Sequence, residues 1–217
     1  MPIQPTTQAI ELRGALVIDQ MQPQFAATIA ASSDGYFPVA GESAFWLEVR
    51  PGIVINRLLD VALKNCDVRP GALITERSYG TLEVHGPDQG QVREAGERML
   101  QAAGVSADDG LAPHVMTDEV IRQIDDHHAM LINRTRAGML VLGRETLYTL
   151  EVNPAIWALL AANEAEKCSP IRIVGLGTNG AVGRLRLCGS DAEIEEAVGA
   201  IHRALDGVVG RKHKGID

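Results

Sequence analysis

The sequence has no apolar run of about twenty residues, which is the length that a membrane-spanning helix requires. It also lacks an excess of positive charge: 20 lysines and arginines stand against 28 acidic residues, and the formal net charge is -8. A surface that tracks nucleic-acid phosphates needs a basic patch. We therefore expect neither a membrane nor a nucleic acid among the partners of this protein.

Cysteines and aromatic residues are scarce. The three cysteines, Cys66, Cys168 and Cys188, follow no ligand or disulfide spacing. Such a set fits buried thiols in a reducing cytoplasm better than a disulfide framework or a zinc site. His127 and His128 lie beside two aspartates, but adjacent helical residues point about 100° apart and cannot easily share one ion. We therefore expect no bound metal.

What the sequence does contain is an internal repeat. Residues 47–96 match residues 150–199 at a constant offset of 103 without a gap, and fifteen of these 50 pairs are identical. Average composition would give roughly three identities by chance. The chain is therefore a tandem duplication. The clearest identical pairs are Leu47 with Leu150, Glu48 with Glu151, Pro51 with Pro154, Lys64 with Lys167, Thr75 with Thr178, and Gly80 with Gly183.

Each copy is predicted to run strand, short helix, strand, helix, strand, strand, helix. Apolar residues at i, i+3, i+4 and i+7 from Ile55 indicate a helix with one buried face. Capping pairs, Asp88 with Gln91 and Ser190 with Glu193, are expected to open the last helix of each copy. The expected strands cover 11–19, 43–49, 71–75 and 80–85, then 119–124, 147–152, 171–176 and 183–188.

This element order predicts a mixed fold of the α+β kind, in which each copy forms a mostly antiparallel sheet with flanking helices. The connection at 102–113 is rich in small and polar residues, which is typical of a domain boundary. We therefore expect two domains, at residues 9–106 and 112–210. A duplicated domain can supply two positions of a ring, so that three chains form a pseudohexamer.

One turn differs between the copies. Thr75–Gly80 carries Glu76, Arg77, Ser78 and Tyr79 between two predicted strands, whereas the counterpart Thr178–Gly183 carries Asn179 and Gly180 and has no charge. A charged pair between two strands is usually a solvated hairpin tip. Because the second copy omits the charges, folding of the unit does not require them.

Other motifs favour structural interpretations. Residues 175–180 match the dinucleotide fingerprint G-x-G-x-x-G, but the following residues alternate like a strand, whereas the fingerprint needs a helix there. Lys64 and Lys167 lie near the C-terminal ends of equivalent helices, where a cation complements the helix dipole. No catalytic triad or spaced carboxylate pair stands out, and Glu48 and Glu151 are explained by duplication. We expect no cofactor and no enzymatic activity.

Several segments together resemble bacterial microcompartment shell proteins. The resemblance extends from about residue 11 to residue 205, and the group that it resembles is the tandem-domain, trimer-forming class with circularly permuted domains, which occurs in carboxysomes and metabolosomes. The matching segments are Glu11-Leu12-Arg13, Gln22-Pro23-Gln24, Pro51-Gly52-Ile53, Asn56-Arg57, Ala62-Leu63-Lys64, Glu76-Arg77 with Tyr79-Gly80, Ala162–Lys167, and Gly183-Arg184-Leu185.

This resemblance implies a structural protein of a microcompartment shell in the bacterial cytoplasm. Three chains would form a pseudohexagonal tile, and two tiles could stack face to face. The tile would pack edge to edge with hexameric and pentameric shell proteins. The family pattern puts Glu76 and Arg77 on a central pore that small polar metabolites cross, with the two side chains exchanging places between open and closed states. It puts Lys64 and Lys167 at the tile edge.

The neighbours Ser78 and Tyr79, and Thr178, Asn179 and Gly180 of the second copy, would line the same pore. Two other classes stay open from the residues alone. A ligand-binding regulator could also be built from duplicated small domains, and it would stay discrete and bind one metabolite. An enzyme would need a convergent acid-base cluster, which the sequence does not show.

Overall fold

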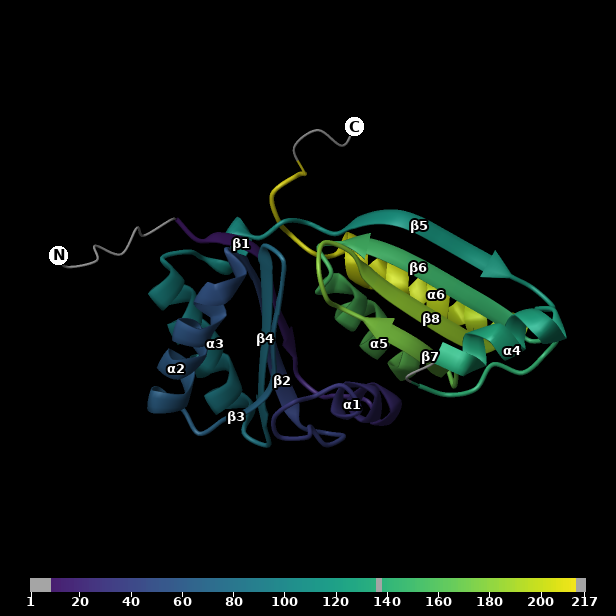
Figure 1. The fold of residues 1–217 in the computed structure, drawn as a ribbon, viewed down its shortest axis with the longest axis horizontal. Helices are drawn as coiled ribbons and strands as arrows, with labels where there is room; N and C mark the ends of the chain where they lie inside the picture. Colours follow the sequence, from purple (N-terminus) through teal and green to yellow (C-terminus); the bar gives the residue numbers. More distant parts are fainter. Residues whose placement is uncertain (1–8, 136–137, 214–217) are drawn as a thin grey trace.

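The computed structural model describes residues 9–135 and 138–213. It contains two four-stranded antiparallel sheets, each with helices against it (Figure 1). The first unit comprises β1 (Glu11–Ile18), α1 (Pro23–Ala30), β2 (Ser43–Arg50), a 3-10 turn (Gly52–Val54), α2 (Ile55–Asn65), β3 (Arg69–Glu76), β4 (Tyr79–Gly86) and α3 (Gln89–Ala103). The second comprises β5 (His114–Ile121), α4 (Asp126–Thr135), β6 (Thr146–Asn153), α5 (Trp157–Cys168), β7 (Arg172–Gly177), β8 (Gly183–Gly189) and α6 (Asp191–Asp206).

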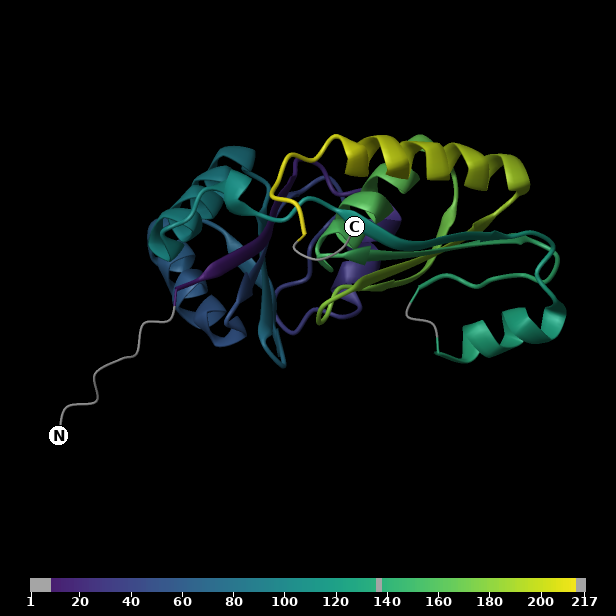
Figure 2. The same ribbon diagram turned by 90° about the horizontal axis from the view of Figure 1, so that it is seen from above.

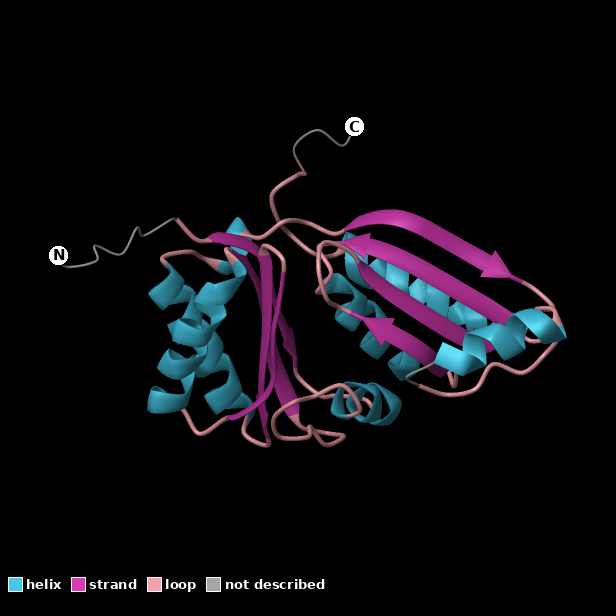
Figure 3. Ribbon diagram, viewed as in Figure 1, coloured by secondary structure: helices cyan, strands magenta, loops and turns pink. Residues whose placement is uncertain are grey.

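The two sheets have the same topology. Their strand orders are β1-β2-β4-β3 and β5-β6-β8-β7, so equivalent strands occupy equivalent places in the two sheets. The predicted α+β architecture is confirmed, and the offset of 103 extends beyond the matched residues: β1 at Glu11–Ile18 maps onto β5 at His114–Ile121. Figure 3 shows the two sheets side by side, with α2 and α3 on the outer side of the first.

The strand expected at 119–124 is wrong in position. The structure has β5 at His114–Ile121, and none of its residues, Val115 and Met116 included, is buried. Most residues of β5 are exposed and only Val120 and Ile121 pack against buried clusters, so the strand shows no clear alternation and the pattern misplaces it. The repeat offset alone would have given the correct register.

Two smaller expectations need correction. Asp88 does cap α3 by accepting from the amides of Gly90 and Gln91, but the Gln91 side chain accepts from the Asp67 amide and does not return to Asp88. The reciprocal capping box at Ser190 and Glu193 is confirmed. Of the cysteines only Cys188 is buried. Cys66 is half-buried and Cys168, at the end of α5, is exposed.

The apolar residues form a core that joins the two units. Leu47 and Leu82 pack under α2 and α3 in a core of the first unit alone. On the other face of the same sheet, Leu16 and Trp46 belong to a cluster that also contains Trp157 of α5. The sheet of the first unit is therefore covered on one face by its own helices and on the other by the second unit.

Polar contacts run along the same boundary. The carboxylate of Glu166 on α5 accepts from the amides of Gln24 and Phe25 at the start of α1, at 2.8 Å each. The Gln24 side chain donates to the Ile171 carbonyl at 2.7 Å and accepts from the Ile173 amide. We call the contact of α5 and β7 with α1 and the sheet of the first unit the inner joint. Helix α4 has no comparable contact with the other unit: it packs within its own unit, where Ala129 is buried with Leu147 and Val174, and it lies at the far end of the second unit (Figure 2).

Candidate functional site

The two turns that the repeat singles out lie next to each other at one end of the inner joint. The guanidinium of Arg13 donates to the Ala181 carbonyl in the second turn at 3.1 Å, and its carbon lies 4.2 Å from the ring centroid of Tyr79 in the first. A Cβ added at Gly180 would lie 3.5 Å from the Glu76 carboxylate. The fold therefore brings the expected pore residues of both units to one place.

Glu76, Arg77 and Ser78 are exposed, and Tyr79 is half-buried against Arg13. In the second turn Asn179 is exposed, whereas Thr178 is buried. Within residues 9–135 and 138–213, the side chains of Glu76 and Arg77 make no hydrogen bond or ion pair. Both charged side chains are thus free to take partners from outside the chain.

The backbone of Arg77 is strained. Its φ is 53°, in the left-handed region that costs a residue with a Cβ about 1–2 kcal/mol. The equivalent residue of the second unit is Gly180, with a φ of 91°, and glycine adopts this conformation without a steric penalty. The positive φ at this position of the turn therefore favours glycine, but the first unit has arginine there. Such strain is typical of functional positions.

A buried ion pair lies beside the two turns. Arg13 on β1 lies 2.5 Å from the carboxylate of fully buried Glu48 on β2, and it also donates to Asn153 of the second unit at 2.8 Å. Glu48 accepts from the Ile156 amide at 2.9 Å. Burial raises the pKa of Glu48, and Arg13 and the amides of the second unit oppose that rise.

The sequence pattern attributes Glu48 to duplication alone and assigns no part to Arg13. A comparison of equivalent residues in the two copies could have identified Arg13 and Glu48. Arg13 corresponds to Met116, and Glu151, the counterpart of Glu48, pairs with Arg184 at 2.6 Å on an open surface. The two copies therefore differ where the inner joint meets the turns.

The two lysines lie far from the turns, in the last turns of α2 and α5. Lys64 forms an exposed ion pair with Asp60 at 2.6 Å, and Lys167 forms one with Glu164 at 3.5 Å. Exposed pairs of this kind contribute little to stability. Both side chains are therefore available to a neighbouring molecule.

The other motifs do not form sites. The glycine run at 175–180 leads from β7 into strand β8 and opens no helix, as the alternation predicted. His127 lies 3.4 Å from Asp125, and the described residues contain no group of three side chains suited to a metal ion. Among these residues no helix is long and apolar enough to cross a membrane.

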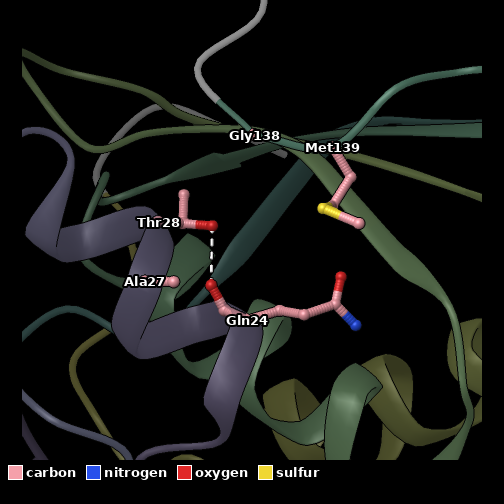
Figure 4. Close-up of a pocket in the computed structure, with 5 residues that line it drawn as sticks. All are labelled: Gln24, Ala27, Thr28, Gly138 and Met139. Carbon is pink, nitrogen blue, oxygen red and sulfur yellow. Dashed lines mark hydrogen bonds between the residues drawn. The ribbon is translucent and has the colours of Figure 1, made fainter.

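One cavity of about 230 Å³ lies in the inner joint, between α1 and the loop at Gly138 and Met139 (Figure 4). Its lining is small or apolar apart from Gln24 and Thr28. The Thr28 hydroxyl donates to the Gln24 carbonyl, and the Gln24 side chain is bonded to β7. The lining thus presents no convergent acid-base or ligand-binding group, and the cavity is a packing gap.

The strain at Arg77 predicts opposite effects on stability for substitutions at the two equivalent turn positions. Arg77→Gly should raise the free energy of unfolding by up to about 1 kcal/mol because it removes a left-handed residue with a Cβ. Gly180→Ala should lower it by about 1 kcal/mol because it adds one. Urea unfolding at one protein concentration measures both. If Arg77→Gly is destabilising, the arginine side chain holds the turn, and the strain argument is wrong.

Comparison with known proteins supplies the family. Residues 12–109 match the family model described as the CsoS1D N-terminal domain. The chain is 45% identical to the carboxysome shell protein CcmP of Synechococcus elongatus, over 95% of this chain and 97% of that protein. It is 42% identical to the carboxysome shell protein CsoS1D of Hydrogenovibrio crunogenus, over 90% of this chain and 96% of that protein.

The fold agrees with these relatives. The structure of a double-ringed trimeric shell protein from the RMM microcompartment superposes with a TM-score of 0.91 at 38% identity, and it covers 94% of this chain and 100% of its own. Duplicated four-stranded sheets, two turns at one joint and identity of this extent over nearly the whole chain lead to one assignment. The chain belongs to the tandem-domain bacterial microcompartment shell proteins, the family of CcmP and CsoS1D.

Proposed function

We propose that three copies of this protein form a pseudohexagonal tile of a microcompartment shell, in which residues 9–106 and 112–210 are the two domains and the two turns line a central pore. As a member of a family of structural shell proteins, it is a structural component and not an enzyme. The observation that carries the proposal is the meeting of both turns at one end of the inner joint. A threefold axis beside them would gather six turns in a ring.

The chemistry of such a pore follows from its residues. Three copies each of Glu76 and Arg77 would alternate with three neutral turns around Asn179 and Gly180. At roughly 10 Å and an effective dielectric constant near 20, each pair of arginines would repel by about 1–2 kcal/mol before screening by salt. Pairing each Arg77 with a Glu76 carboxylate removes that repulsion and narrows the pore. Turning Arg77 away from the axis widens it.

This arrangement supports a gate for small polar metabolites. The two side chains have no partner in the described chain, so they can exchange positions without breaking an existing ion pair. States that differ by a few kcal/mol respond to any ligand that prefers one of them. A small anion that binds Arg77 would therefore shift the pore toward its open state.

The gate is tested by Glu76→Ala and Arg77→Ala. Removal of Glu76 should leave the arginines unpaired and increase the permeability of a reconstituted shell to a small anion several-fold. Arg77→Ala should abolish the preference for anions over neutral solutes. Electron microscopy of the trimers gives the aperture, and Glu97→Ala on α3 is the control. An aperture and permeability equal to those of the wild type in both variants would disprove the gate.

The two lysines support contacts at the edges of the tile. Lys64 and Lys167 occupy equivalent places in α2 and α5, so a trimer would carry six equivalent exposed cations on its rim. Each is held only by an exposed pair with a neighbouring carboxylate. We infer that they contact adjacent hexameric, pentameric or identical shell tiles edge to edge.

Edge contacts can be tested by assembly. Lys64→Ala and Lys167→Ala trimers should form fewer and smaller sheets than the wild type, because each removes three of six rim cations. Negative-stain electron microscopy measures the sheets, and Lys212→Ala near the end of the chain is a control of the same chemistry. Unchanged sheets in the variant that lacks both Lys64 and Lys167 would exclude an edge role.

A set of exposed apolar side chains supports face-to-face stacking of two trimers. Tyr36, Phe37 and Val39 follow α1, and each has an exposed apolar counterpart 103 residues later in Met139, Leu140 and Leu142. A rotation about the tile axis keeps equivalent residues at one height, so six such loops would form an apolar ring on one face. Contiguous exposed apolar surface is typical of a protein interface. The ring would be covered by a second trimer.

Stacking predicts a particle of six chains. Phe37→Asp together with Leu140→Asp should convert it to a trimer of half the mass, because twelve charges would be placed in the apolar ring. Light scattering after size exclusion measures the mass. Val209→Asp, also at an exposed apolar residue, should leave it unchanged. A wild type that is trimeric at all concentrations would exclude stacking.

A further inference from the structure

A buried acid and a buried histidine lie together at the end of β4 that is opposite to the first turn. Glu83 and His85 point from the same face of the strand, and both are completely buried. Nδ1 of His85 lies 2.9 and 3.2 Å from the two carboxylate oxygens of Glu83. The counterparts in the second unit are the exposed Arg186 and the buried thiol of Cys188. Because the second unit lacks the acid–histidine pair, folding of a unit does not require it.

The backbone of β3 makes room for the Glu83 carboxylate. The register of β3 against β4 is irregular opposite Glu83, and the Ala72 amide interacts with the carboxylate there. A Cβ added at Gly71 would lie 1.9 Å from a carboxylate oxygen and 3.3 Å from the His85 ring. Glycine at this position therefore lets the acid pack directly against the backbone of β3.

The same glycine anchors the loop that follows α1. The Gly71 carbonyl accepts from the Gly35 amide at 2.9 Å and from the Ser33 hydroxyl, and the Pro70 carbonyl accepts from the Tyr36 amide at 2.8 Å. We call residues 33–42 the first loop. It carries the exposed apolar side chains that are assigned above to the stacking face. One residue of β3 thus contacts the buried pair and also holds this loop.

The other end of the first loop is held by a charged group. Glu42 accepts from the Val39 amide at 3.0 Å and lies 3.8 Å from Arg69, which is opposite His85 in the sheet. Asp34 of the same loop is exposed. Glu42 and Arg69 are therefore the charged groups that adjoin the buried pair on the side of the loop.

The other elements over this face bring no uncompensated charge. Trp46, the neighbour of Glu83 on β2, packs with Phe25 of α1 in the core of the inner joint, and α1 has no titratable side chain. The ion pair of Glu48 lies farther along the same face of β2, and Glu166 on α5 is bonded to the amides that open α1. The charge of the buried pair itself is therefore the one that can vary here.

Loss of one proton changes the pair from neutral to negative. With a proton on the Glu83 carboxyl group and one on the His85 ring, the pair is neutral and the acid can donate to Nδ1. Burial raises the pKa of Glu83 and the Glu42 carboxylate raises it further, whereas His85 and the Ala72 amide oppose the rise. A raised pKa stabilises the folded state at low pH, and this stabilisation is lost as the pH rises through the raised value.

We propose that Glu83 and His85 form a proton-binding site that keeps the first loop anchored on β3 while the pair is neutral and releases the loop when the pair becomes negative. A buried net charge is unfavourable until water reaches it. Release of the loop uncovers Gly71 and admits water to the carboxylate beside it. Nε2 of His85, which has no partner within the described residues, also gains a water on opening.

The second unit supplies a control within the same chain. Its second loop, residues 138–145, is anchored in the same way, because the amides of Gly138 and Met139 donate to carbonyls of β7. Beneath it the Cys188 thiol donates to the Leu140 carbonyl at 3.4 Å. Burial raises the pKa of Cys188, so this thiol stays neutral at and above neutral pH. We therefore expect the anchor of the second loop to be insensitive to pH.

Hydrogen exchange of the loop amides tests the site. Protection factors are measured at about pH 5.5 and about pH 8.5, which bracket the range into which burial moves a carboxyl pKa. The protection of Gly35 and Tyr36, divided by that of Gly138 and Met139, should fall about tenfold at the higher pH. The ratio cancels any effect of stacking, which would cover both loops. An equal ratio at both pH values in the wild type would overturn the proposal.

Two variants assign the effect to the pair. Glu83→Gln has the shape of the protonated acid and no titratable group, so its ratio should be the same at both pH values. His202→Gln removes an exposed histidine that is bonded to Asp118, and it should behave as the wild type does. If Glu83→Gln retains the full pH dependence of the wild type, the pair is not the proton-binding site.

The consequence for assembly rests on the stacking proposed above. Release of the first loop would disorder half of the apolar ring, so the particle of six chains should separate into trimers at the higher pH, and Glu83→Gln should stay stacked. Light scattering measures the mass at both pH values. If the wild type is trimeric at both and the exchange ratio still falls, stacking is wrong while the proton-binding site stands. If the particle stays stacked and the ratio is constant, the site is wrong while stacking stands.

Discussion

The buried pair of Arg13 and Glu48 is the contact on which the arrangement of the two units depends. Glu48 is fully buried, so it needs both the guanidinium and the backbone amide of Ile156 to remain charged there. Removing one partner of such a pair typically costs about 3–5 kcal/mol. Because Arg13 also contacts Tyr79 and Ala181, the same pair sets the positions of both turns. The relative position of the two turns is thus fixed inside each chain.

After the duplication the two units diverged, so equivalent positions now carry residues with different properties. The first unit carries a strained arginine at its turn, whereas the second unit keeps the glycine that this backbone conformation favours. Fusion of the units also means that any side chain occurs three times around a ring and not six. Three arginines repel far less than six would at the same radius. A charged gate is therefore easier to build from a fused chain than from six identical ones.

Local signals in the sequence were sufficient for most of the fold. The apolar face that starts at Ile55 and the capping box at Ser190 predicted helices, and the element order of the repeat predicted antiparallel sheets, although not the order of their strands. The repeat also singled out the two turns, because only one of them is charged. Strand β5 was misplaced because most of its residues are exposed, so it carries no clear periodic signal. The inner joint was missed for a related reason. Trp46 and Glu48 are buried by the second unit, and the spacing of residues within one strand does not show which other element covers that strand.

The two short helices differ in how their first turns are satisfied. The amides that open α1 are held by Glu166, which the second unit supplies, so α1 is complete only once the chain has folded as a whole. Helix α4 has its own acceptor in Asp125, which takes the His127 amide. A helix that is already capped does not have to be nucleated during an encounter. Helix α4 therefore forms within its own unit, whereas the first turn of α1 depends on both units.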